Sequence, residues 1–97
     1  MKPVVLAPAA EEEMLVSARY YESRQSGLGD QFLNELLQTG ARIAEYPDAW
    51  PVISGKIRRC LFNRFPFGLI FRIEAERIYV LAVMHMKRKP NYWNNRL

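Results

Sequence analysis

The hydrophobic period of the sequence changes once, at the segment bounded by Pro47 and Pro51. Before Pro47, apolar residues recur every three or four positions, as they do on one face of an α-helix. After Pro51, runs rich in β-branched and aromatic residues follow a period of two, as they do in strands. The 97 residues suffice for one modest core. We therefore expect a single domain, residues 1–97, in which helices and strands share that core.

Proline and glycine divide these two halves into elements. Pro8 suits the first turn of a helix, because its missing N–H is not needed there, and "QSGLGD" marks a turn through its two glycines. The expected elements are a strand at residues 4–7, a helix from residue 8, a second helix from residue 28 to the stop at residue 47, and strands at residues 56–62, 67–74 and 77–85. This β-α-α-β-β-β order, followed by a short C-terminal turn or helix, predicts a two-layer α+β domain. A helical hairpin should pack on a small, mainly antiparallel sheet.

Both expected helices carry an apolar stripe, and the last strand is apolar on both faces. The stripes comprise Ala10, Met14, Ala18 and Tyr21 in the first helix, and Leu28, Phe32, Leu36, Gly40 and Ile43, broadened by Leu33 and Leu37, in the second. In the last strand, strict alternation places Ile78, Val80, Ala82 and Met84 on one face and Tyr79, Leu81 and Val83 on the other. We expect this strand to be central and covered on both sides.

Charge is distributed unevenly along the chain. Its 14 lysines and arginines outnumber the 10 acidic residues, for a formal net charge of +4. Acidic residues gather early, at residues 11–13, whereas residues 54–97 hold most of the basic residues and only Glu74 and Glu76 as acidic ones. This asymmetry suits an anionic partner, either nucleic acid or an acidic protein, although solubility alone also accounts for it.

The sequence offers little for metals, cofactors or membranes. Cys60 is the only cysteine, so neither a disulfide framework nor a metal-ligand cluster is expected, and a reducing compartment is the simplest location. The stretch before Pro8 is too short for a signal-peptide core or a membrane span. Phosphate-binding glycine loops and nucleophile elbows do not occur. We expect a cytoplasmic protein that uses no metal or cofactor.

The end of the last strand is the strongest candidate for a site, because polar residues follow its apolar run directly. His85 could act as a general acid or base, or it could be a packed structural histidine. Lys87, Arg88 and Lys89 could neutralise phosphates or developing oxyanions, or they could form a solvated run or a dock for an acidic partner.

Aromatic residues and a second pair of cations offer similar alternatives. Tyr92 and Trp93 could stack on splayed bases beside the cations, or they could fold back to cover the edge of the sheet. Arg58 and Arg59 are adjacent on a strand, so their side chains should point to opposite faces. Only one of them can therefore share a surface with the C-terminal cations.

Four blocks of the sequence together resemble a known family. They are "ARYYESRQSGLGDQFLNEL" at residues 18–36, "YPDAWP" at 46–51, "IRRCLFNRFPFGLIFRI" at 57–73 and "IYVLAVMHMKRKPNYWNNR" at 78–96. In combination and order they resemble the RelE/ParE toxin superfamily of bacterial type II toxin-antitoxin systems, whose fold has the same element order. The resemblance implies a growth-inhibiting toxin, associated with plasmid stabilisation. It also implies a cognate antitoxin that wraps around the toxin in a hetero-oligomer.

The superfamily divides in mechanism. RelE-like members cleave mRNA in the ribosomal A site, whereas ParE-like members poison DNA gyrase. RNA cleavage by the 2′-OH needs proton removal, proton delivery and stabilisation of a dianionic phosphorane. A strand arginine that serves RelE falls on Gly68 here, and its paired lysines fall near Arg59 and Leu61. The sequence thus lacks part of that charge constellation, unless His85 compensates.

The resemblance favours the ParE type, because the paired helices with "YYE...GLG..F" are more similar to ParE-like members. We therefore expect poisoning of DNA gyrase, with the antitoxin as the neutralising partner. The alternative is a RelE-like, metal-independent mRNA endonuclease acting on the ribosome, in which His85, Arg88 and Tyr92 would be catalytic. A third possibility is an inactive remnant that only binds its antitoxin.

The resemblance also implies which residues face the target or the antitoxin. These are Arg58, Arg59, Lys87, Arg88, Trp93 and Arg96. Acidic antitoxin residues would pair with Arg58, Arg88 or Arg96, and apolar ones would fill grooves beside the helices, facing Leu33, Leu37 or Phe62.

Overall fold

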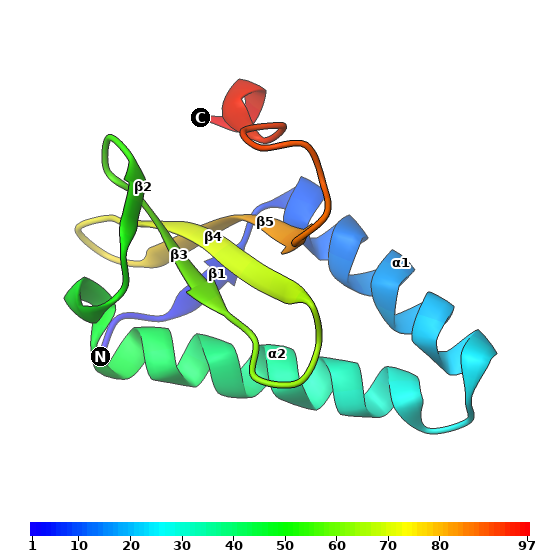
Figure 1. Ribbon diagram of the computed structural model, residues 1–97. Coiled ribbons are helices and arrows are strands. Elements are labelled where there is room, and N and C mark those ends of the chain that lie inside the picture. Colours follow the sequence, from blue (N-terminus) through cyan, green and yellow to red (C-terminus); the bar gives the residue numbers. More distant parts are fainter.

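Two helices cover one face of a five-stranded sheet, and the C-terminal segment lies against the other face (Figure 1). The computed structural model describes residues 1–97. The elements are β1 (Val4–Leu6), α1 (Pro8–Arg24), α2 (Leu28–Glu45), β2 (Val52–Ser54), β3 (Ile57–Leu61), β4 (Phe67–Ile73) and β5 (Ile78–His85), with 3₁₀ turns at Pro47–Ala49 and Asn94–Arg96. The sheet order is β1-β5-β4-β3-β2. The expected α+β fold is confirmed.

One strand was missing from the sequence prediction. β2 is an edge strand of three residues that pairs with β3 in an irregular antiparallel register. It lies between Pro51 and Gly55, and a run this short carries no detectable period. β1 pairs with β5 in parallel, and the other pairings are antiparallel, so the sheet is mixed but mainly antiparallel.

The helical hairpin is closed by glycines at its turn. Gly27 has a φ of 87°, in the left-handed region that favours glycine, and α2 begins directly after it. The Glu22 carboxylate accepts hydrogen bonds from the N–H groups of Gly27 and Gly29 and so caps α2 from α1. A Cβ at Gly29 would lie 2.7 Å from the Ala18 carbonyl oxygen. The two helices are therefore in close backbone contact at this point.

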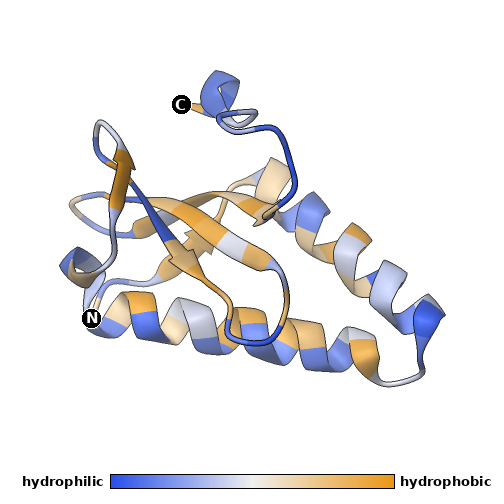
Figure 2. Ribbon diagram, in the orientation of Figure 1, coloured by the Kyte–Doolittle hydropathy of each residue, from blue (hydrophilic) through white to orange (hydrophobic).

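The sheet has a core on each face. The larger core, the helix-side cluster, includes Phe32, Leu36, Ile43, Leu69, Phe71, Ile78, Val80 and Val83. The smaller core, the second cluster, consists of Ile57, Ile70, Leu81, Ala82, Met84 and Trp93. Figure 2 shows β4 and β5 as largely hydrophobic ribbons and the C-terminal segment as mostly hydrophilic. β5 is thus central and covered on both sides, as expected.

The predicted faces of β5 are wrong from Ala82 onward, because a β-bulge interrupts the alternation. Ala82 pairs with Ile70 and Val80 with Phe71, which leaves Leu81 as the extra residue. Leu81 and Ala82 both join the second cluster, and Val83 returns to the helix-side cluster.

The expected apolar stripe of α2 is too wide at one position. Leu37 is 68% exposed, because it lies beyond the arc of the helix that faces the sheet, whereas Leu33 packs against the helix-side cluster. Neither helix is long and apolar enough to cross a membrane.

Candidate functional site

A tight turn follows β5 and presents the basic run. The N–H of Lys87 donates to Nδ1 of His85 at 3.0 Å, and the N–H of Arg88 donates to the His85 carbonyl oxygen at 2.9 Å. The His85 ring packs edge-on against Phe67, with 5.0 Å between ring centroids. Because Nδ1 accepts a backbone hydrogen bond, a neutral His85 carries its proton on Nε2. His85 is thus part of the turn, with one nitrogen left for other contacts.

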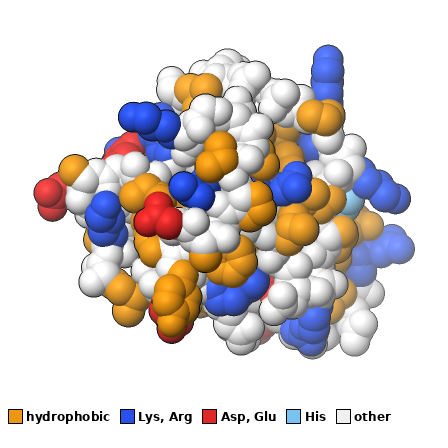
Figure 3. All heavy atoms as spheres, turned by 60° about the vertical axis from the view of Figure 1, so that its left-hand side comes forward, with side chains coloured by type: hydrophobic (Ala, Val, Ile, Leu, Met, Phe, Trp, Pro, Cys, Tyr) orange, Lys and Arg blue, Asp and Glu red, His pale blue; other side chains and the backbone are white.

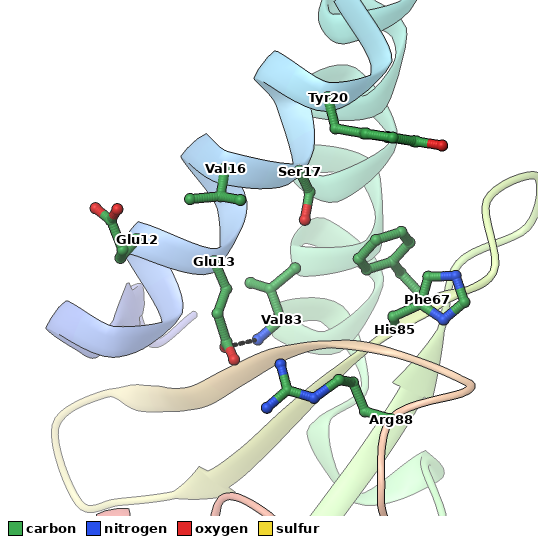
Figure 4. Close-up of a pocket in the computed structure, with 9 residues that line it drawn as sticks. All are labelled: Glu12, Glu13, Val16, Ser17, Tyr20, Phe67, Val83, His85 and Arg88. Carbon is green, nitrogen blue, oxygen red and sulfur yellow. Dashed lines mark hydrogen bonds between the residues drawn. The ribbon is translucent and has the colours of Figure 1, made fainter. Parts of the chain in front are cut away.

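A pocket of about 370 Å³ lies between α1 and this strand end (Figure 4). Its lining residues are Glu12, Glu13, Val16, Ser17 and Tyr20 from α1, and Phe67, Val83, His85 and Arg88 from the sheet and the turn. The pocket therefore has an acidic wall and a basic wall with apolar side chains between them. It brings together two of the predicted site residues, His85 and Arg88.

Glu13 holds the C-terminal segment against α1 and β5. Its carboxylate accepts hydrogen bonds from the Val83 N–H at 3.0 Å, from the Tyr92 hydroxyl at 2.7 Å, and from both terminal nitrogens of Arg96 at 2.9 and 3.0 Å. Arg96 also donates to the Leu81 carbonyl oxygen. Glu13 and Arg96 thus satisfy backbone groups beside the bulge at Leu81. We call Glu13, Tyr92 and Arg96 the carboxylate clamp.

Two members of the clamp, Tyr92 and Arg96, have raised pKa values. Burial raises the pKa of Tyr92, and the hydrogen bond and charge of Glu13 raise it further, so the phenol remains a donor. The hydrogen bond to Glu13 raises the pKa of Arg96. The guanidinium carbon of Arg88 lies 4.0 Å from the centroid of the Tyr92 ring, in cation–π contact. Tyr92 and Arg96 therefore serve the internal structure, and Arg88 packs on the Tyr92 ring.

Several predicted interface residues are engaged within the chain. Trp93 is only 1% exposed and completes the second cluster, because the aromatic pair folds back over the sheet. The contact role predicted for Trp93 therefore does not fit this structure. Arg58 donates to the carbonyl oxygens of Asp48 and Trp50 and pairs with the Asp48 carboxylate. Arg58 and Arg96, which were expected to meet an acidic partner, already meet carboxylates of this chain.

A side chain at Gly68, where RelE carries an arginine, would be tightly packed in this structure. A Cβ at Gly68 would lie 3.2 Å from a methyl carbon of Leu61 and 3.4 Å from Cγ of Arg59. Arg59 and Leu61, the positions matching the paired lysines, thus occupy the space beside this glycine. The charge constellation expected of a RelE-like nuclease is incomplete on this strand pair.

A second polar pocket, of about 290 Å³, lies at the outer edge of β3 and was not predicted. Its lining residues are Arg42, Trp50, Pro51, Arg59, Leu61, Phe62 and Asn63. Of these, only Arg59 had been singled out as a basic contact residue. Neither Arg42 on α2 nor Trp50 after the 3₁₀ turn carried a signal in the sequence, because only the fold brings them beside β3.

No group of three or more His, Cys, Asp or Glu side chains is arranged to hold a metal ion. Burial raises the pKa of the Cys60 thiol, and its side chain lies in the helix-side cluster. Cys60 is therefore a packing residue in this fold.

The fold and the strand-end site together define a class: small basic α+β domains in which a helical hairpin backs a sheet and the last strand delivers cations to the surface. The pattern describing the ParE toxin of the type II toxin-antitoxin system, parDE, matches residues 4–90, and the chain belongs to this family. The expected RelE/ParE resemblance, closer to ParE, is thus confirmed.

A solved structure described as the chromosomal ParDE TA system from P. aeruginosa has the same fold. It is 14% identical to this chain, with a TM-score of 0.72, and the match covers 88% of this chain and 96% of the other. No curated protein sequence matches the chain.

Proposed function

We propose that this chain is a toxin that inhibits growth by poisoning DNA gyrase, and that a cognate antitoxin neutralises it in the cytoplasm. Membership in the ParE toxin family carries this proposal. The RelE-like alternative, an mRNA endonuclease, needs a set of free acid, base and cationic groups. The strand-end site supports this alternative less well than it supports a ParE-like toxin.

Two features weigh against RNA cleavage. The Tyr92 hydroxyl, which would serve as an acid or base, donates to Glu13, and burial together with the Glu13 carboxylate raises its pKa. No side chain hydrogen bond orients His85, whose Nδ1 accepts only the backbone N–H of Lys87. A catalytic histidine usually has a second group that fixes its tautomer and its direction.

The basic turn supports an acidic antitoxin as the partner. Lys87, Arg88 and Lys89 form no ion pair within the chain, whereas Arg58, Arg64, Arg72, Arg77 and Arg96 all do. Of these three cations, Arg88 lines the 370 Å³ pocket together with apolar side chains such as Val16 and Val83. Together they would give acidic and apolar antitoxin side chains adjacent places in a toxin-antitoxin hetero-oligomer.

Two assays on the purified chain test the target: supercoiling by DNA gyrase, and mRNA cleavage on programmed ribosomes. We expect gyrase inhibition with trapped cleavage complexes, and intact mRNA. Arg88→Ala should weaken inhibition about tenfold if the basic turn contacts the target, and Arg19→Ala, which removes an exposed cation on α1, is the matched control.

Cleavage of mRNA that disappears in His85→Ala would overturn the proposal in favour of the nuclease. Silence in both assays, with tight antitoxin binding retained, would identify the chain as an inactive remnant.

A further inference from the structure

The outer edge of β3 is open beyond the point where β2 leaves it. The last backbone hydrogen bond across this edge runs from the Arg59 N–H to the Pro51 carbonyl oxygen, at 3.1 Å. Alternate residues of a strand direct their N–H groups to the same side, so the Leu61 N–H also points outward. β2 begins at Val52 and does not reach Leu61. The Leu61 carbonyl oxygen is occupied, because Arg42 donates to it at 3.1 Å.

A buried donor without a partner belongs to Trp50, a residue that lines a pocket at this edge. Nε1 of Trp50 is shielded from solvent and makes no hydrogen bond within the chain. A buried unsatisfied N–H costs on the order of 1–3 kcal/mol, and most such groups in native proteins have a partner. Trp50 lines the 290 Å³ pocket, so a side chain that enters the pocket meets this indole.

Two arginines without carboxylate partners line the same pocket. Arg42 is held in place by hydrogen bonds to the Thr39 hydroxyl and the Leu61 carbonyl oxygen, and its guanidinium lies 5.6 Å from the Trp50 ring centroid. No ion pair in the chain involves Arg42 or Arg59. The lining thus offers donors from Trp50, Arg42 and Arg59, and its nearest strand acceptor is already used.

We propose that this pocket binds a side-chain carboxylate of an extended acidic peptide, whose backbone continues the sheet at the open edge of β3. The carboxylate would meet the guanidinium groups of Arg42 and Arg59 and the indole N–H of Trp50. A backbone carbonyl of the peptide would accept from the Leu61 N–H, as in strand addition. Apolar neighbours in the peptide would cover Leu61, which is 46% exposed.

A peptide suits this edge better than a nucleic acid. Pro51, Leu61 and Phe62 supply apolar surface in the same lining as the arginines, and a strand that alternates acidic and apolar residues can contact both. Figure 3, which brings the left-hand side of Figure 1 forward, shows basic side chains interleaved with hydrophobic ones across the face in view. This inference rests on the proposed function at one point only, which is that the peptide would be a segment of the antitoxin.

The test uses the intact chain labelled with ¹⁵N, in which Trp50 and Trp93 give two indole N–H signals. The probes are two capped pentapeptides, Val-Glu-Val-Glu-Val and Val-Gln-Val-Gln-Val. We expect the glutamate peptide to shift the Trp50 signal and leave that of buried Trp93 in place, and to bind at least tenfold more tightly than the glutamine peptide.

Variants separate recognition from folding. Arg59→Ala should weaken binding of the glutamate peptide about tenfold, and Arg59→Lys should recover part of the loss. Arg24→Ala, at the far end of α1, is the matched control and should bind like the unaltered chain. Trp50→Phe should weaken binding without lowering the stability of the free chain, since it removes a donor that has no partner there.

Equal binding of the two peptides, or shifts confined to residues around His85, would overturn the inference. Stronger displacement of the Trp50 signal by a short single-stranded oligonucleotide than by the glutamate peptide would also overturn it, in favour of nucleic acid. Because neither gyrase nor antitoxin is present, this result is independent of the supercoiling assay, and each proposal can fail alone.

Discussion

At the scale of single residues, Glu13 has the largest structural role for which the sequence holds no signal. Its carboxylate joins α1, β5 and the C-terminal segment through four hydrogen bonds. In the sequence it is one of three successive glutamates at the start of a helix, where an interaction with the helix dipole is the simplest explanation. Only the fold shows that Glu13 faces the strand while Glu12 is exposed.

Replacing Glu13 by Gln should therefore destabilise the chain by about 1–3 kcal/mol, because Arg96 loses its carboxylate and the amide cannot accept every bond. Glu12→Gln removes the same charge from the neighbouring exposed position and should change stability by less than about 0.5 kcal/mol. Urea unfolding followed by circular dichroism measures both. Equal losses of stability in the two variants would contradict the stabilising role of the carboxylate clamp.

The candidate site was predicted from the sequence as far as neighbours in the chain could reveal it. His85, Lys87 and Arg88 follow a buried strand, and a strand end presents side chains at the surface, so their placement could be expected. The internal partners of Arg58 and Arg96 could not, because Asp48 and Glu13 lie 10 and 83 positions away.

At the scale of elements, the closest approach of α1 and α2 depends on a missing side chain. A Cβ at Gly29 would meet the Ala18 carbonyl oxygen at 2.7 Å, whereas a Cβ at Gly40 in the same helix would meet only a Val4 methyl group at 3.8 Å. We therefore expect opposite effects on stability when each of these two glycines is replaced by alanine.

Gly29→Ala should destabilise the chain by about 1–3 kcal/mol, since the backbone of α1 must move away. Gly40→Ala should stabilise it by up to about 1 kcal/mol, through better helix propensity without a clash. Thermal unfolding of both variants measures the contrast. A stabilised Gly29→Ala variant would contradict the close contact between the helices.

Most elements were predictable because the hydrophobic pattern of each one repeats over enough residues to be detected. Helices of 17 and 18 residues contain several turns of apolar repeat, and Pro8 and the glycines mark their boundaries. β2, with three residues, and the bulge at Leu81 depend on pairing with β3 and β4. Such features are set by the partner strand and leave no trace in local composition.

At the scale of the whole molecule, the sheet is buried on both sides although only one side has helices. The second cluster depends on Trp93, whose indole fills the space over Ile70, Leu81 and Met84. The C-terminal segment around it is mostly hydrophilic (Figure 2), so this single side chain supplies much of its apolar contact with the sheet.

Trp93→Ala should destabilise the chain by about 3–5 kcal/mol, a large part of the roughly 5–15 kcal/mol expected for a domain. It should also increase binding of a hydrophobic dye, because the second face of the sheet becomes exposed. Leu97→Ala, at a residue that is 62% exposed, should do neither. A Trp93→Ala variant as stable as the unaltered chain would show that the segment is not part of the core.

The parallel pairing of β1 with β5 joins the first strand to the last, with Val4 opposite Ile78. During synthesis, at roughly 5–20 residues per second, β1 is made several seconds before the strand it pairs with. β1 and β4 flank β5 in the sheet, so neither strand can form that pairing until β5 has been made. The proposed surface at His85 and Arg88 therefore forms only after β5, the last strand of the sheet, has been made.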